Sequence, residues 1–249
     1  MKKLFAVTLI VLYIVAMPIM AKYNVTWASS INQPIPDSYR MKIPVIRQMP
    51  ELPRGCEVTS LAMVLHSKGI EVDKMDLARK VKKNPEIYQV KGGKVYFGDP
   101  NEGFVGDMYT YKNPGLGVYH KPIHELATSY VGDLAVDLTG QPFEEILREV
   151  AKGNPVWVIQ NSRFNTLPPQ QWVTWHTSNG AIRVTYREHS VVITGYDSKY
   201  IYVNDPLTGE QNRRLLRSSF IKGWKQMGSQ AITIQNGNKE VFHFWQSIN

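Results

Sequence analysis

The chain has 249 residues, enough for one large domain or two small ones with a buried core. Its hydrophobic content of 43% and charged content of 20% are ordinary for a globular protein, which excludes a disordered or fibrous chain. The 29 basic and 21 acidic residues give a formal charge of +8, which favours acidic surroundings such as anionic wall polymer or lipid. Because the basic residues are scattered along the chain, we expect no nucleic-acid partner.

The first 21 residues have the layout of a secretory signal peptide. Lys2 and Lys3 precede an apolar run from Leu4 to about Ala16, and the small residue Ala21 suits the position before a cleavage site. The alternative is an uncleaved membrane anchor, because the stretch from Leu4 to Ala21, about 18 residues, is close to the length that spans a bilayer. Both outcomes predict a secreted or extracytoplasmic protein at the cell envelope, which meets the membrane only through this segment if it is uncleaved.

The pattern of apolar residues then predicts the elements in chain order. We expect an extended segment over residues 22–40 and one folded domain over 41–249. The expected elements of the domain are a strand at 41–46, helices at 57–66, 72–82, 122–131 and 143–150, strands at 154–159, 190–196 and 200–204, a helix at 220–227 and a strand at 231–234. The stretches 91–117 and 160–180 are expected to be long loops. Helices come first and antiparallel strands later, so the predicted class is α+β.

No metal or cofactor is expected from the sequence. His120 and His124 have the spacing of a metal pair on a helix, but Pro122 between them is expected to be the first helical residue, which leaves His120 outside the helix. A single cysteine also excludes an internal disulfide and a multi-cysteine zinc site. The chain has no nucleophile-elbow serine motif and no phosphate-binding loop, which removes serine hydrolases of that type and nucleotide enzymes.

Cys56, the one cysteine, directly precedes a predicted helix. An idle exposed thiol in an exported protein is an oxidation liability, so Cys56 is either buried and inert, paired between chains, or kept for its chemistry. The free N–H groups and positive dipole at a helix N-terminus favour the thiolate, so this position predicts a lowered thiol pKa. A nucleophilic cysteine also needs a base, and the base needs an orienting group.

His189 and Asp205 supply such a pair. A hairpin turning near Ser198 would place them at the same end of its two strands, within about a residue of direct opposition. A carboxylate at that position can accept a hydrogen bond from the imidazole. The spacing leaves open which face of the hairpin each side chain occupies.

Three segments together resemble a known family: Gly55–Met63 (GCEVTSLAM), Glu188–Asp197 (EHSVVITGYD) and Asn204–Leu207 (NDPL). They are similar to motifs of the bacteriocin-processing (double-glycine leader) cysteine peptidases, and more closely to the exported, stand-alone branch of that peptidase-like family. The resemblance runs from about Ile43 to Ile234. It implies a papain-like α+β fold whose nucleophile stands at a helix N-terminus packed on an antiparallel sheet.

The resemblance also implies the roles of individual residues. Cys56 would be the nucleophile, His189 the general base and acid, and Asp205 the residue that orients the imidazole ring. The oxyanion donor of papain-like enzymes is a glutamine shortly before the nucleophile. Gln48 is the candidate here, although it lies eight residues upstream, slightly further than usual, so the turn between them must be longer.

The expected function is therefore that of an exported bacterial cysteine peptidase-like hydrolase, which cleaves peptide or amide bonds at the cell envelope. Its expected partner is a peptide or protein substrate, with cell-wall peptide as one class. Two alternatives remain open from the sequence. One is an acyltransferase that uses the same triad, and the other is a catalytically inactive module that binds peptide or wall polymer.

Overall fold

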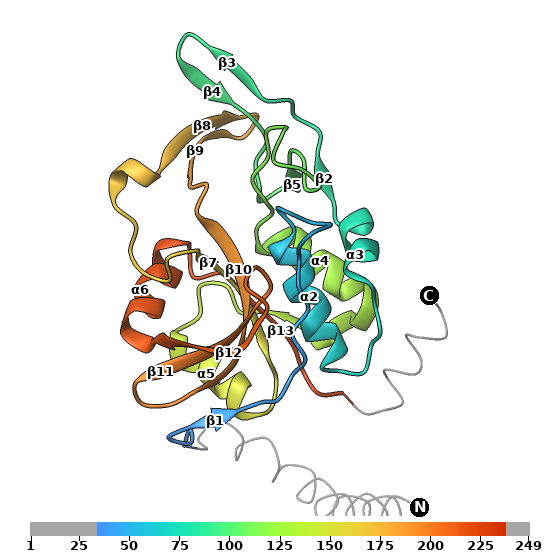
Figure 1. Ribbon diagram of the computed structural model, residues 1–249, viewed down its shortest axis with the longest axis vertical. Coiled ribbons are helices and arrows are strands. Elements are labelled where there is room, and N and C mark those ends of the chain that lie inside the picture. Colours follow the sequence, from blue (N-terminus) through green and yellow to red (C-terminus); the bar gives the residue numbers. More distant parts are fainter. Residues whose placement is uncertain (1–33, 238–249) are drawn as a thin grey trace, which may run out of the picture. The chain divides into compact units, whose positions relative to one another are not determined.

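A seven-stranded sheet forms the centre of the fold, with the order β12-β11-β10-β7-β13-β6 and β1 paired to β10. All neighbouring strands in it are antiparallel (Figure 1). The computed structural model describes residues 34–237, so the predicted signal peptide at 1–21 lies outside the described residues, as does most of the segment 22–40. The strands of the sheet are β1 (Tyr39–Arg40), β6 (Ala135–Asp137), β7 (Val156–Asn161), β10 (Glu188–Tyr196), β11 (Tyr200–Asp205), β12 (Glu210–Leu216) and β13 (Ala231–Ile234).

Helices cover both faces of the sheet (Figure 1). α2 and α4 lie against β13 on one face, where α2 also contacts β10 and β7, while α5 and α6 pack on β7 from the other face. The helical elements are α2 (Cys56–His66), α3 (Lys74–Lys80), α4 (His120–Val131), η1 (Gly132–Leu134), α5 (Phe143–Ala151), η2 (Pro169–Gln171) and α6 (Arg217–Gln226). Every residue of β7 is buried, as expected for a central strand covered on both faces.

The main hydrophobic core fills the space between the sheet and α2. Alternate residues of a strand point to opposite faces, and Trp157 and Ile159 of β7 join Val192 of β10 in this core. Every residue of α2 from Cys56 to Leu65 is buried, so the helix is enclosed on all sides. The position of Cys56 is therefore determined by a helix that packs against its neighbours on all sides.

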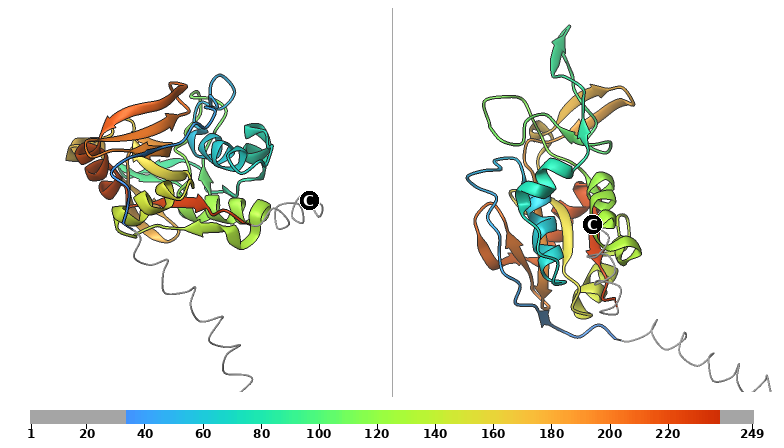
Figure 2. Two further views of the ribbon diagram at one scale, coloured as in Figure 1. Left: turned by 90° about the horizontal axis from the view of Figure 1, so that it is seen from below. Right: turned by 90° about the vertical axis from the view of Figure 1, so that its right-hand side faces the viewer.

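A second, four-stranded sheet has the order β3-β4-β8-β9 and stands apart from the first (Figures 1 and 2). It has a small core of its own, in which Trp175 packs against Phe97 with ring centroids 5.1 Å apart. The elements of this region are β2 (Lys83–Asn84), β3 (Gln89–Lys91), β4 (Lys94–Tyr96), β5 (Phe104–Val105), β8 (Val173–Thr177) and β9 (Gly180–Val184), and β2 pairs with β5. The prediction of long loops at 91–117 and 160–180 was wrong here, because the strands within them pair with each other.

The α+β class is confirmed, and most predicted helices are present with small shifts. α3 begins after Asp73, whose carboxylate accepts from the Met75 N–H at 2.6 Å, as a helix cap does. α4 begins at His120, so the prediction that Pro122 is its first residue was wrong. The strand predicted at 41–46 was also wrong: only β1 forms, immediately before it, and Pro44 within the stretch has no N–H to donate to a ladder. Between residues 34 and 237, no helix is both long enough and apolar enough to cross a bilayer.

Candidate active site

Cys56 is the first residue of α2, with Gly55 as the preceding cap. A side chain on Gly55 would meet the Cβ of Leu52 at 2.6 Å, so the turn that leads into the helix closes this tightly only with glycine. α2 packs along β10 and carries Cys56 to the start of that strand. The thiol itself is buried and belongs to no disulfide.

His189 lies at the start of β10 and Asp205 at the end of β11, as the hairpin prediction required. The strands pair with Val192 opposite Asn204, within about a residue of the expected register. Nε2 of His189 lies 2.9 Å from Oδ1 of Asp205, a hydrogen-bond distance. The predicted juxtaposition of imidazole and carboxylate is therefore present.

Asp205 is held from three sides. Its side chain is only 1% exposed, Arg213 Nη1 donates to Oδ2 at 2.7 Å, and the Leu207 N–H donates to Oδ1 at 2.9 Å. Burial by itself raises the pKa of Asp205, but the hydrogen bond and charge of His189, the bond from Arg213 and the Leu207 N–H together hold it well below its usual range. Asp205 is therefore a carboxylate with both oxygens occupied, and His189 has a fixed partner.

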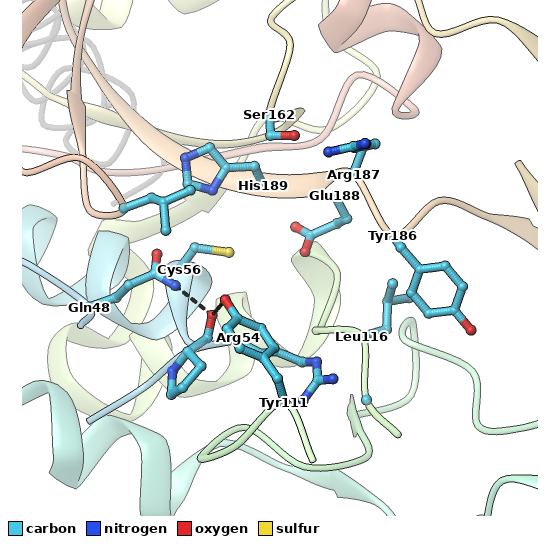
Figure 3. A pocket seen from close by; sticks show the side chains of 13 residues that line it. Gln48, Arg54, Cys56, Tyr111, Leu116, Ser162, Tyr186, Arg187, Glu188 and His189 are labelled. Carbon is cyan, nitrogen blue, oxygen red and sulfur yellow. Dashed lines mark hydrogen bonds between the residues drawn. The ribbon is translucent and has the colours of Figure 1, made fainter. Parts of the chain in front are cut away.

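A cavity of about 270 Å³ brings Gln48, Cys56 and His189 together (Figure 3). His189 and Cys56 both line this space, while Asp205 does not line it and contacts the imidazole of His189. Tyr111, from the glycine-rich stretch before α4, lies on its other side (Figure 3). Three of the four predicted site residues thus share one cavity, and the fourth contacts it through His189.

Gln48 is buried in the wall of the cavity, but its amide is already engaged. Nε2 donates to the carbonyl oxygens of Pro53 at 2.9 Å and Leu52 at 3.2 Å, while Oε1 has no hydrogen-bond partner among the described residues. The longer turn expected between Gln48 and Cys56 is thus tied together by Gln48 itself. To reach an oxyanion, Nε2 would have to share one of these N–H groups with it.

The pKa of the Cys56 thiol differs from the predicted one. Burial raises its pKa well above the ordinary value, and the charges of Glu188 and then Glu57 raise it further. Sγ lies 3.4 Å from Oε2 of Glu57, the next residue along α2. The expectation of a lowered thiol pKa was wrong, because desolvation and two carboxyl groups outweigh the helix N-terminus.

Glu57 and Glu188 are the functional candidates that the sequence reasoning missed. One ligand atom from each carboxyl group and Sγ of Cys56 all lie within 4.8 Å of one another. Burial raises the pKa of Glu57 to about 7, and burial together with the charge of Glu57 raises the pKa of Glu188 well above its usual range. Both residues directly adjoin a motif residue, Cys56 or His189, and that adjacency was the available signal.

Strand alternation separates the roles of Glu188 and His189. Successive residues of β10 point to opposite faces, so Glu188 faces Cys56 and Glu57 while His189 faces Asp205. On the Glu57 side, the Val118 N–H donates to Oε1 at 2.7 Å. Because both residues lie at the start of β10, the side chains of Glu188 and His189 nevertheless line the same cavity.

Two groups bear on metal binding. Cys56, Glu57 and Glu188 are the described residues whose ligand atoms gather closely enough to hold an ion, although the thiol and carboxyl protons would have to leave first. The pair His120 and His124 is divided between other partners. His120 Nδ1 lies 2.6 Å from a carboxylate oxygen of Asp137, and His124 Nε2 lies 3.1 Å from the Ala135 carbonyl oxygen.

Comparisons with known proteins all point to the same protein family. Residues 40–232 match the model of the Peptidase_C39 like family. The chain is 54% identical over 186 residues to the Uncharacterized protein YvpB of Bacillus subtilis (strain 168), covering 75% of this chain and 71% of that protein. The crystal structure of a candidate C39-like peptidase from Bacillus anthracis superposes with a TM-score of 0.75 at 45% identity, covering 82% of this chain and 100% of that one.

Proposed function

Because the chain belongs to the Peptidase_C39 like family, we propose that it is a cysteine peptidase with a papain-like fold, which hydrolyses peptide or amide bonds through Cys56, His189 and Asp205. The observation that carries the proposal is the 2.9 Å contact between His189 and Asp205 at the edge of the cavity that contains the thiol. A cysteine, an imidazole and an orienting carboxylate are the parts that nucleophilic catalysis of acyl transfer needs.

The proposed reaction begins with proton transfer from Sγ of Cys56 to His189. Because Nε2 of His189 is held by Asp205, Nδ1 is the nitrogen left to accept that proton. The sulfur bonds to the substrate carbonyl carbon, the C–N bond breaks, and the Nδ1 proton passes to the departing amine. Water then attacks the thioester and gives a proton to Nδ1, the C–S bond breaks, and the proton returns to the sulfur. A raised thiol pKa suits a thiol that loses its proton to His189 during attack rather than a preformed thiolate.

Two donors are proposed for the oxyanion. One is the backbone N–H of Cys56, which is free of intrahelical bonds because the residue begins α2. The other is Nε2 of Gln48, which would turn one N–H away from the Leu52 carbonyl, the longer of its two contacts at 3.2 Å. Gln48 then serves the reaction only after a small adjustment of its amide.

We place this activity outside the cytoplasmic membrane, at the cell envelope. The support is the signal-like composition of residues 1–21 and the formal charge of +8, which suits an anionic envelope. Peptides of the envelope, including cell-wall peptides, are the proposed substrate class.

The test is a screen of defined peptides and purified wall fragments with the mature protein. We expect release of new amino termini by the wild type and loss of release in Cys56→Ala and His189→Ala, with all proteins folded by circular dichroism. The exposed Asp133→Asn serves as the matched control and should keep full activity. Release that survives in Cys56→Ala would overturn the nucleophile assignment.

A catalytically inactive binding module is the second candidate, and the raised pKa of Cys56 is the observation that favours it. Such a module would bind wall fragments or peptides equally well as wild type and as Cys56→Ala, and release nothing. Binding in a sedimentation assay without any Cys56-dependent product would replace the peptidase proposal with this one.

A further inference from the structure

The carboxyl groups of Glu57 and Glu188 lie beside each other and beside the thiol of Cys56. Among residues 34–237, neither carboxyl group takes part in an ion pair. Oε1 of Glu188 is buried and has no hydrogen-bond partner in the same range. Burying an acceptor without a donor costs free energy, so a site that keeps one gains when a donor arrives.

Neither arginine that lines the cavity forms an ion pair with Glu188. Nη1 of Arg54 donates to the carbonyl oxygen of Asp107 at 3.0 Å, and its guanidinium stacks over the Tyr111 ring. Arg187 lines the cavity but is exposed, and it forms no ion pair with the neighbouring Glu188. Figure 3 shows the Glu188 carboxyl group directed toward the sulfur of Cys56 rather than toward either guanidinium.

Glu188 and Glu57 contribute differently to this acidic pair. Glu188 lines the cavity, whereas Glu57 is fully buried behind it and receives the Val118 N–H. Gly117 makes room for both, because a Cβ there would collide with the Glu57 carboxylate and come within 2.8 Å of Glu188 Oε2. A ligand in the cavity would therefore meet Glu188 directly and Glu57 through it.

We propose that Glu188, backed by Glu57, selects substrates that carry a free amine, as its ammonium ion, beside the carbonyl that Cys56 attacks. This inference rests on the proposed peptidase function and names its substrate class. The ammonium would donate to the unpartnered carboxyl oxygen and stabilise the ionised form of the acidic pair. A substrate with an acylated amine would offer neither the charge nor the same donors.

The short distances in the cavity suit an α-amine. A carbonyl carbon approaches the sulfur to about 3–3.5 Å, and an ammonium nitrogen sits about 2.8 Å from a carboxylate oxygen. Since the sulfur and a Glu188 carboxyl oxygen lie within 4.8 Å, an amine on the carbon next to the carbonyl can reach Glu188 while the carbonyl carbon stands at the sulfur, as in an amino-terminal residue. The cavity of about 270 Å³ lies just below the usual range for ligand sites, which suits a chain end.

The ammonium would also act on the thiol. Glu188 and Glu57 both oppose ionisation of Cys56, after burial itself. A positive charge bound at Glu188 offsets that opposition, so the thiol becomes easier to ionise when the correct substrate is present. Recognition and activation of the nucleophile would then depend on the same group.

The test uses methanethiosulfonate reagents, which transfer an alkylthio group to the cysteine sulfur, form a mixed disulfide with it, and release methanesulfinate. The aminoethyl reagent carries an ammonium, the methyl reagent is neutral, and the sulfonatoethyl reagent is anionic. Each labelling rate of Cys56 is divided by the rate with free 2-mercaptoethanol, which removes the intrinsic reactivity of the reagent. We expect the aminoethyl reagent to be favoured over the methyl reagent by about 10- to 100-fold, from the strength of a hydrogen-bonded charge pair.

Substitution assigns the preference to Glu188. In Glu188→Gln the aminoethyl-to-methyl ratio should fall to about one, while the exposed control Glu144→Gln on α5 should retain the wild-type ratio. If Glu188→Gln does not fold, Glu188→Ala provides the same comparison with a shorter side chain. An unchanged ratio in the folded Glu188 variant, or a preference for the sulfonatoethyl reagent in the wild type, would overturn the proposal.

A second arm separates this inference from the proposed function. Aminoacyl-p-nitroanilides are compared with their N-acetylated forms, and we expect the free-amine forms to be cleaved preferentially in a Glu188-dependent way. Equal cleavage of both forms, dependent on Cys56, overturns the ammonium inference and leaves the peptidase intact. Reagent selectivity lost in Glu188→Gln, without cleavage of any substrate in the screen, supports the cation site and overturns the peptidase.

Discussion

Replacing Asp205 with asparagine removes the charge that holds His189 while nearly conserving shape. The amide oxygen can still accept the Leu207 N–H, which lies 2.9 Å from Oδ1 in the wild type. The negative charge that serves His189 at 2.9 Å and Arg213 at 2.7 Å is lost. The substitution therefore separates the electrostatic contribution of Asp205 from its packing.

The expected loss of stability follows from these two contacts. Hydrogen bonds to charged groups contribute about 1.5–3 kcal/mol each, and removing one partner leaves the other uncompensated. Because the Arg213 side chain is 30% exposed, it can regain water, and its share is discounted. We expect Asp205→Asn to lower the free energy of unfolding by about 2–4 kcal/mol at pH 7.

The lowered pKa of Asp205 also determines how its contribution to the free energy of unfolding changes with pH. The pKa of Asp205 is lowered in the folded protein, so its contribution is complete above the unfolded value of about 3.9 and is lost as the pH falls below it. Urea unfolding of wild type, Asp205→Asn and the exposed control Asp133→Asn would be compared at pH 7 and in steps down to pH 3. The gap between wild type and Asp205→Asn should narrow toward pH 3. A gap that is absent at pH 7, or constant with pH, would refute the reasoning.

Three further predictions concern the cavity. Glu188→Gln should accelerate alkylation of Cys56 by neutral iodoacetamide at pH 7, because a carboxyl group whose charge opposes ionisation of the thiol is replaced by a neutral amide; an unchanged or slower rate would contradict this. Gln48→Ala should reduce kcat about 100- to 1,000-fold with little change in KM if its amide serves the oxyanion, whereas a loss of stability alone would mean that it only ties the turn. Gly117→Ala should destabilise the protein by about 1–3 kcal/mol in urea unfolding, because its Cβ would collide with the buried Glu57 carboxylate. An unshifted urea midpoint would show that the side chains of Glu57 and Glu188 can move aside without loss of stability.

Local sequence patterns predicted the parts of the fold that local physics determines. The spacing of apolar residues predicts helices such as α2 and α5, and an apolar run between turns predicts β13. The small sheet was missed because its strands are stabilised by partners far away in the chain, as where Val95 of β4 pairs with Trp175 of β8. Short strands of that kind carry no periodic signal long enough to distinguish them from loop.

The site shows the same division. Sequence motifs predicted Cys56, His189 and Asp205 as site residues. The spacing of the hairpin predicted that His189 and Asp205 lie together, as the structure shows. The thiol pKa could not be predicted in the same way, because it depends on burial of the sulfur and on Glu188, which β10 brings to it from far along the chain. Electrostatics at a buried group is a property of the whole packing, whereas a helix N-terminus is visible locally.

The central claim is that the sulfur of Cys56 becomes covalently attached to the acyl group of the substrate. The most direct measurement mixes the protein with p-nitrophenyl acetate, quenches in acid within the burst of p-nitrophenolate, and locates the added acetyl mass by peptide mass spectrometry. We expect an acetyl thioester on the peptide containing Cys56, absent in Cys56→Ala and formed much more slowly in His189→Ala. A burst that persists in Cys56→Ala, or an acetyl group found on another residue while Cys56 stays free, would contradict it.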